Sequence, residues 1–267
     1  MSNYIALDWF DLALASLFLL LNAGLSIWLR LGMARQLIIA GARMIVQLLL
    51  VGLVLKWVFG AVSIWLTAGL MLLMLGFATR EVMARQERAL AGIWGWSLGG
   101  GAMASAGLMV TVFGLTFAIQ PEPLWSARFA LPLLGMILGN TMTGVALGLD
   151  SFLGALSREK ANVEARLLLG ATREEAMRPQ IRRAIRRGFT PIINAMAATG
   201  VVSLPGMMTG QILSGVDPQE AVKYQLLIMF LIGGASGLGV IGAVLGAAKR
   251  MSDTRHRLRL DRLRPAK

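Results

Sequence analysis

Seven apolar stretches, each close to the length of a membrane-spanning helix, constrain this sequence more than any other feature. A bilayer core needs about 20 apolar residues per helix, and lipid offers no partner for an unpaired backbone amide. The stretches also lack the alternating pattern of a barrel strand. We therefore predict an all-α polytopic membrane protein with about seven transmembrane helices. The expected spans cover residues 12–29, 40–59, 62–79, 92–119, 129–149, 190–213 and 224–248.

Composition supports this class and excludes others. Hydrophobic residues make up 56% of the 267 residues and charged residues 15%, whereas charge is nearer a quarter of an ordinary soluble domain. Without cysteine, disulfides, thiolate metal sites and cysteine nucleophiles are excluded. The predicted spans also lack His, Asp and Glu, so an intramembrane enzyme has no acid–base set. We expect no cofactor in this chain.

The distribution of basic residues predicts the orientation. Of the 26 basic residues, 23 fall on one side of the predicted spans, and only Lys56, Arg128 and Lys223 lie on the other. The positive-inside rule places the rich side in the cytoplasm. We therefore predict an outside N-terminus and a cytoplasmic C-terminus in the plasma membrane, which is the inner membrane of a bacterium. The net charge of +12 then reflects topology and attraction to lipid headgroups rather than nucleic acid.

The chain is expected to form one transmembrane domain, residues 1–250, with a basic cytoplasmic tail, residues 251–267. Inside the domain, the cytoplasmic segment 150–189 separates spans five and six. There Gly170 is typical of a helix C-terminus, Thr172 and Glu175 have the spacing of a capping box, and Pro179 should bend the second helix. These signals predict a helix-turn-helix. The alternative is a solvated amphipathic connector resting on lipid headgroups.

Polar and helix-breaking residues at membrane depth mark the expected substrate path, because lipid-facing positions penalise them. A proline before a glycine in span six predicts a broken helix that lines a cavity. Arg43 has a simpler alternative, which is to snorkel toward the cytoplasmic interface. Thioethers suit Cu(I) rather than Fe(II), so no metal ligand is assigned. The candidate path residues are Arg43, Gln47, Asn140, Thr143, Asn194, Ser203, Pro205, Gly206, Met207 and Met208.

Several blocks resemble a known transporter family. Glu164 and Ala165, with Gly170 six residues after the glutamate, resemble the EAA motif through which the membrane subunit of an ATP-binding cassette (ABC) transporter contacts its ATPase. The longer blocks GMILGNTMTGVALGL, LLLGATREEA, GVVSLPGMMTGQILSGVDPQEAVKYQ and SDTRHRL are similar to the Fet-type iron-export permeases. The resemblance covers nearly the whole chain. The coupling residues that it implies are Glu164, Ala165, Gly170, Ala171, Thr172, Glu175 and Ala176.

The function implied by this resemblance is that of a permease subunit of an ABC exporter for iron or another metal-related cargo. No G-x-x-x-x-G-K-[ST] motif occurs in the sequence, so ATP and Mg²⁺ are expected on a separate ATP-binding subunit. A permease homodimer embedded in membrane lipids is also implied. The alternative function is an ATP-independent secondary carrier or channel. Ion-coupled carriers usually keep an acidic residue at membrane depth, whereas here the acids lie at the ends of the predicted spans.

Overall fold

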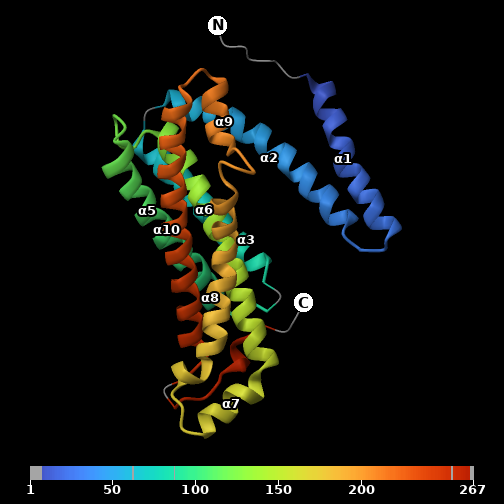
Figure 1. Cartoon of the computed structure of the whole chain (residues 1–267), viewed down its shortest axis with the longest axis vertical. Helices are drawn as coiled ribbons and strands as arrows, with labels where there is room; N and C mark the ends of the chain where they lie inside the picture. Colours follow the sequence, from blue (N-terminus) through green and yellow to red (C-terminus); the bar gives the residue numbers. More distant parts are fainter. Residues whose placement is uncertain (1–7, 62, 87, 254, 265–267) are drawn as a thin grey trace. The chain divides into compact units, whose positions relative to one another are not determined.

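The computed structural model describes residues 8–61, 63–86, 88–253 and 255–264, and their regular structure is helical apart from isolated β-bridges. Six helices in this described part are long and apolar enough to cross a membrane (Figure 1). The all-α prediction is therefore confirmed, and six of the seven predicted spans each coincide with a different one of these helices. The six are α1 (Trp9–Trp28), α2 (Ala34–Gly60), α3 (Ile64–Ala84), the composite helix Ile93–Ile119, α6 (Ala127–Arg158) and α10 (Pro218–Arg250).

The described chain divides into two compact units, and the first consists mainly of α1 and α2. These helices form a hairpin whose connection is held by Ser26, which accepts a hydrogen bond from the Met33 amide at 3.0 Å. Gly41 allows close packing, because a Cβ atom there would lie 2.5 Å from the Leu19 Cδ2 atom. The first unit is therefore a helical hairpin with a tight glycine contact.

The composite helix Ile93–Ile119 belongs to the second unit and contains two π-helical segments. Its parts are α4 (Ile93–Gly95), η1 (Trp96–Gly100), α5 (Gly101–Phe113) and η2 (Gly114–Ile119). Gly100 lies against α3, where an added Cβ would be 2.1 Å from the Thr79 Cγ2 atom. Gly114 lies against α10, with Leu231 2.8 Å from the same added atom. Both close contacts involve a π segment, so they occur where the helix departs from regular α geometry.

The centre of the second unit is formed by α6, α8 (Arg173–Ala198) and α10, which run side by side (Figure 1). Phe152, Leu156 and Val244 are fully buried in its main apolar cluster. A Cβ on Gly144 would lie 2.8 Å from the Gly188 carbonyl oxygen, and a Cβ on Gly188 would lie 2.9 Å from the Gly144 carbonyl oxygen. The backbones of α6 and α8 therefore nearly touch at these two glycines.

The predicted span at 190–213 is divided between two helices. Helix α8 ends at Ala198, and α9 (Gly206–Leu213) begins directly after Pro205. Between them Gly200 has a φ of +89°, and its amide donates to the Ser203 carbonyl at 2.9 Å. The left-handed glycine and the proline together prevent a continuous helix. The break predicted beside Pro205 and Gly206 is present, and it extends back to Thr199.

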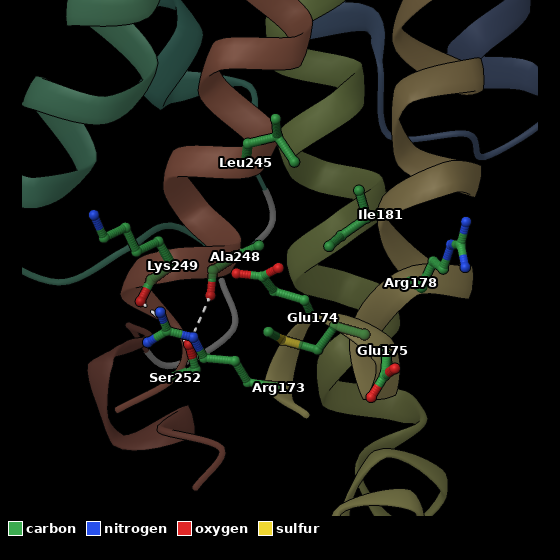
Figure 2. A pocket seen from close by; sticks show the side chains of 10 residues that line it. Arg173, Glu174, Glu175, Arg178, Ile181, Leu245, Ala248, Lys249 and Ser252 are labelled. Atoms are coloured by element: carbon green, nitrogen blue, oxygen red, sulfur yellow. Dashed lines mark hydrogen bonds between the residues drawn. The ribbon is translucent and has the colours of Figure 1, made fainter. Parts of the chain in front are cut away.

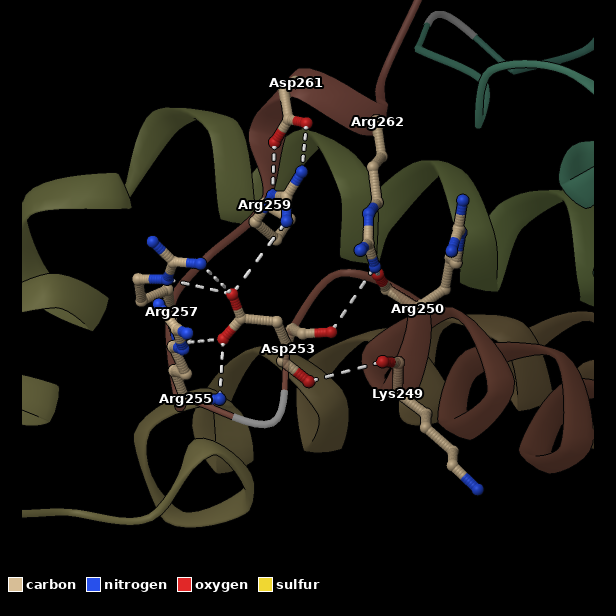
Figure 3. Close-up of polar contacts among 9 residues, drawn as sticks. Lys249, Arg250, Asp253, Arg255, Arg257, Arg259, Asp261 and Arg262 are labelled. Carbon is tan, nitrogen blue, oxygen red and sulfur yellow. Dashed lines mark hydrogen bonds and ion pairs between the residues drawn. The ribbon is translucent and has the colours of Figure 1, made fainter.

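After α10 the described residues 251–253 and 255–264 pack within the second unit, and we call them the C-terminal strap. The Ala91 amide donates to the Arg262 carbonyl, and the Arg264 amide donates to the Ala89 carbonyl, both at 2.8 Å. Asp253 organises the loop at the start of the strap by accepting from the Arg257 amide at 2.9 Å (Figure 3). The basic tail expected from the sequence is thus hydrogen-bonded to the connection between α3 and α4.

Candidate coupling segment and transport path

The turn between α7 (Lys160–Leu168) and α8 closes with a Schellman motif at Gly170. Its φ of +92° is a left-handed conformation that favours glycine. The Gly170 amide donates to the Leu167 carbonyl and the Ala171 amide to the Arg166 carbonyl, both at 3.1 Å. The short helix therefore ends in a defined geometry. We call residues 168–172 the coupling turn.

Helix α8 begins with the capping box expected from the sequence. The Thr172 hydroxyl oxygen accepts from the Glu175 amide at 3.3 Å, and a Glu175 carboxylate oxygen accepts from the Thr172 amide at 2.9 Å. The backbone hydrogen bond from Thr172 is the main cause that lowers the pKa of Glu175. The end of α7 and the start of α8 are thus both capped at the turn that joins them. We call α7, the coupling turn and the first half of α8 the elbow.

The coupling turn presents two exposed leucines above a buried base. Leu168 is 88% exposed and Leu169 is 87% exposed. Immediately below them, Val163 and Met177 are buried in the main apolar cluster, and Leu167 packs against it. The elbow is therefore anchored from both helices while its tip exposes apolar surface. Sequence reasoning did not single out the two leucines, although an apolar LLL run inside a polar segment was an available signal.

The other predicted coupling residues surround this tip. Ala165 is exposed and Ala171 is half-buried, whereas Ala176 is fully buried in the main cluster. Glu164 is partly exposed and pairs with Lys160 one turn earlier, at 3.6 Å. The buried Ala176 supports the elbow from beneath, and Glu164 and Ala165 remain accessible on α7.

A polar cluster ties the start of α7 to the side of α8. Glu159 accepts hydrogen bonds from Arg183 at 2.8 Å and from Gln180 at 2.9 Å. The hydrogen bond from Arg183 is the main cause that lowers the pKa of Glu159. These contacts cross the elbow, so they fix the angle between its two arms.

The C-terminal strap reaches the first residue of α8 through His256. Its Nδ1 atom accepts a hydrogen bond from the Arg173 amide at 3.1 Å, at the first residue of α8. Beside this contact lies an open groove of ≈630 Å³ between the start of α8 and the end of α10 (Figure 2). Arg173, Met177, Leu245 and Lys249 are among the residues that line it. The strap was expected to be a simple tail, and its contact with the elbow depends on folding that the sequence pattern does not reveal.

Polar residues predicted for the substrate path lie on exposed faces of α6 and α8. Asn140 and Asn194 are exposed and Thr143 is half-exposed. The Asn140 amide donates to the Met136 carbonyl at 2.9 Å, and the Thr143 hydroxyl donates to the Gly139 carbonyl at 3.2 Å. These hydrogen bonds remain within α6, so the side chains satisfy part of their hydrogen-bonding capacity locally.

The packing of α6 against α8 brings Asn140 and Asn194 to a similar level. The two helices run antiparallel, because Gly144 lies against Gly188 and Gly148 lies near Ala184 one turn farther along. In that register Asn140 corresponds to residue 192, so Asn194 is offset by two residues, or about 3 Å of helix rise. Two exposed amide side chains therefore lie at nearly the same height on adjacent helices.

The remaining path residues are divided between the two units. Arg43 and Gln47 are exposed on α2, which belongs to the first unit. Ser203 lies in the break, Met207 packs against a second apolar cluster, and a buried Thr141–Ser236 contact of 3.4 Å joins α6 to α10. The sequence did not indicate Ser236, because its role is apparent only from its contact with Thr141, which is distant in the sequence. Pro205, Gly206 and Met208 complete the segment around the break.

No metal-binding cluster accompanies these residues. Among the described residues, no group of three or more His, Cys, Asp or Glu side chains could hold a metal ion. Met207 is half-buried among apolar neighbours, which is the ordinary environment of a methionine in a helical core. The geometry of this part of the chain therefore identifies an elbow and a polar face, but no resident metal centre.

Comparison with known proteins places the chain in a family. Residues 9–252 match the model of the uncharacterised protein family UPF0014. The chain belongs to this family. Among UPF0014 relatives, it is 38% identical to the UPF0014 membrane protein slr1647 of Synechocystis over 234 residues, which cover 85% of this chain and 87% of the relative.

Two further relatives carry more descriptive names. The chain is 30% identical to the probable iron export permease protein FetB of Escherichia coli over 254 residues, covering 95% of this chain and 96% of FetB. It is 29% identical to the protein ALUMINUM SENSITIVE 3 of Arabidopsis thaliana over 231 residues, covering 86% and 82% of the two chains. No solved structure matches. The resemblance to Fet-type permeases is thus confirmed, and the UPF0014 chain is a multi-pass membrane protein.

Proposed function

We propose that this chain is the permease subunit of an ABC exporter, and that a separate ATP-binding subunit docks on the coupling turn. The main support for this proposal is the elbow, in which the end of α7 and the start of α8 are both capped. Leu168 and Leu169 are exposed at its tip, whereas Val163 and Met177 beneath them are buried. A solvated connector needs neither a fixed geometry nor two exposed leucines. A protein partner explains both, because apolar side chains on a rigid turn favour docking into a complementary groove.

The two long helices that the elbow joins, α6 and α8, supply the mechanical connection. Helix α6 runs without interruption from Ala127 to Arg158, and α8 runs from Arg173 to Ala198. Motion at the coupling turn would tilt α6 and α8 together, because Glu159 at the end of α6 accepts from Arg183 of α8 and the Gly144–Gly188 contact is their crossing point. Rigid-body motion of this kind converts a change at one site into movement elsewhere. The break after α8 would then allow the path to open or close.

The proposed orientation follows from the basic residues. The elbow and the C-terminal strap lie in the cytoplasm, and the N-terminus lies outside a bacterial inner membrane. The exact number of spans depends on whether the apolar end of α8 crosses the membrane together with α9. We propose that it does, because residues 188–198 contain no charged side chain and continue directly from the arginine-rich part of the helix.

A homodimer is proposed from the exposed polar face of α6 and α8. Asn140, Thr143 and Asn194 would be costly if they faced lipid. A second copy of the chain would cover this face and create a polar path between the two permeases. ATP and Mg²⁺ would remain on the ATP-binding partners, outside this chain.

Iron is the proposed cargo because the E. coli relative is named a probable iron export permease. The described residues provide no cluster of three or more His, Cys, Asp or Glu side chains that could hold a metal ion. Transport of iron by this chain therefore rests on the relationship and requires a direct measurement.

The test co-reconstitutes the permease and its ATP-binding subunit in proteoliposomes, and measures ATP hydrolysis and iron export separately. Gly170→Pro should abolish the left-handed turn, because proline fixes φ near −65°. Glu164→Lys should reverse the charge beside the docking surface. Both variants should keep ATP hydrolysis and reduce export by roughly tenfold or more, as expected for the loss of about 1.4 kcal/mol of coupling.

Two variants serve as controls. Gly215→Pro changes another left-handed glycine, with φ +89°, and Glu220→Lys reverses the acid of another exposed ion pair, with Lys223. Neither lies in the elbow, so both should leave the ratio of export to hydrolysis unchanged. Wild-type coupling in both elbow variants would refute the assignment, and export without any ATP-binding subunit would favour the carrier or channel.

A further inference from the structure

A cleft between α7 and the first half of α8 carries an excess of positive charge. It has a volume of ≈360 Å³. Glu175 and Pro179 contribute to its wall, but arginine is its dominant residue type. The arginines that line it are Arg166, Arg178, Arg182, Arg183 and Arg186.

The acids close to this cleft are already engaged. The Glu175 carboxylate closes the capping box, and Glu159 is bound by Arg183 and Gln180. Arg166, Arg182 and Arg186 form no ion pair within the described part of the chain. The cleft therefore holds more guanidinium groups than the neighbouring carboxylates can neutralise.

The spacing of these arginines makes the excess costly without a ligand. Arg178, Arg182 and Arg186 follow one another at intervals of four residues, so they lie on one face of α8. Like charges at this spacing repel and destabilise a helix. A bound anion would remove the repulsion, and guanidinium groups recognise phosphate oxygens through paired hydrogen bonds.

The position of the cleft along α8 indicates where the anion comes from. Just beyond Arg187 the helix crosses α6 at Gly188 and enters the apolar clusters, and residues 188–198 carry no charge. The rise from Arg178 to Arg186 is about 12 Å, whereas each headgroup layer of a bilayer is roughly 5–8 Å thick. Where the end of α8 crosses the membrane from Gly188 onward as proposed, Arg186 lies about 3 Å and Arg182 about 9 Å from the hydrocarbon edge. Arg186 then falls within the headgroup layer, Arg182 falls at its outer edge, and Arg178 lies on the cytoplasmic side.

We propose that this cleft binds the phosphate headgroup of an anionic phospholipid. The headgroup would lie against Arg182 and Arg186, with Arg166 and Arg178 closing the cytoplasmic side. Bound there, the lipid would hold both arms of the elbow at the membrane surface. This site is separate from the exposed leucines of the coupling turn, and it rests on the proposed membrane crossing of the end of α8 but not on ATP-driven transport.

The test uses the full chain purified in detergent and reconstituted in nanodiscs of phosphatidylcholine, with or without phosphatidylglycerol. Arg182→Gln/Arg186→Gln is compared with Arg187→Gln/Arg255→Gln, which removes the same charge from exposed positions outside the cleft. Mass spectrometry quantifies the lipid that stays bound to the chain after delipidation in detergent. The midpoint of thermal unfolding of the chain is measured in both nanodisc types. Glutamine keeps a good helix former at each helical position.

The wild type and the control should retain phosphatidylglycerol and show a higher midpoint in the anionic nanodiscs. The cleft variant should lose its preference for phosphatidylglycerol by roughly 25-fold, since each of the two arginines near an anionic surface contributes about fivefold. Its thermal midpoint in pure phosphatidylcholine should equal or exceed that of the wild type, because the substitution removes the repulsion between unliganded arginines, and this result would show that the variant still folds.

Three results would overturn the proposal. Equal losses in the cleft variant and the control would mean that only general surface charge attracts the lipid. A midpoint shift produced equally by millimolar inorganic phosphate in phosphatidylcholine nanodiscs would assign the cleft to a free phosphate. Unchanged lipid retention, combined with loss of a co-purified protein from the cleft variant alone, would assign it to an acidic protein surface.

Discussion

Two glycines determine how closely the central helices approach. A Cβ atom on Gly188 would lie 2.5 Å from the Val240 Cγ1 atom and 2.9 Å from the Gly144 carbonyl oxygen. The second neighbour is backbone, which cannot rotate away as a side chain can. The contact therefore requires glycine on α8 for steric reasons, although Gly188 lies in an ordinary helix and needs no unusual backbone conformation.

Gly188→Ala should destabilise the protein by about 1–3 kcal/mol, the usual cost of overpacking a core. The expected result is a lower thermal midpoint in detergent, measured by the loss of monodisperse protein on heating. Gly234→Ala on α10 is the control, because nothing lies within 4 Å of its added Cβ. A Gly188→Ala protein as stable as this control would show that α6 and α8 are not held at this distance.

The elbow is the element that the sequence predicted best. Its signals are local: Gly170 ends α7, and Thr172 with Glu175 begins α8. Such capping patterns depend on residues three or four positions apart, so they can be recognised without knowing the fold. The same holds for the break beside Pro205, and the apolar stretches likewise predicted six helices of spanning length.

Features that depend on distant partners could not be predicted in this way. Helix α6 continues nine residues beyond the expected end at 149 because its last turns pack on α8 and α10 rather than on lipid. His256 reaches Arg173 across 83 positions of sequence, and Thr141 finds Ser236 across 95. The assignment of individual path residues stays a prediction, since their exposure alone does not identify cargo contacts.

The start of α8 should respond to acid through its capping box. The lowered pKa of Glu175 means that the folded state favours the ionised carboxylate. This stabilising contribution is fully present above the unfolded pKa of about 4.3 and is lost as the pH falls through the lower folded value. The protection of the amides at residues 173–176, measured relative to their intrinsic exchange rates at each pH, should therefore decrease when the pH falls below about 4.

Glu175→Gln provides the comparison, because the side-chain carbonyl oxygen of glutamine can still accept from the Thr172 backbone amide but the group does not titrate. Hydrogen exchange followed by mass spectrometry should show no acid-dependent opening in this variant. The same opening in wild type and Glu175→Gln would assign the effect to another group, such as Glu159, whose pKa is also lowered.

At the scale of the whole molecule, the proposed homodimer places a second copy against the polar face of α6 that contains Asn140 and Thr143. The chain has no cysteine, so a single introduced cysteine is the only thiol. Asn140→Cys in native membranes should give a covalent dimer with a homobifunctional thiol reagent. Val112→Cys, at an exposed apolar position on α5, should remain monomeric. Dimer from Val112→Cys alone would place the interface on a different face.

The most direct test of the central claim is affinity purification of the tagged chain from its own membrane, with quantitative mass spectrometry of the co-purified proteins. We expect a stoichiometric ATP-binding subunit with the wild type and at least about a tenfold loss of it from Leu168→Asp/Leu169→Asp, since buried apolar anchors dominate such interfaces. The variant should remain folded in the membrane, because both leucines are exposed. Wild-type chain recovered intact without any ATP-binding subunit, or full retention of that subunit by the variant, would contradict it.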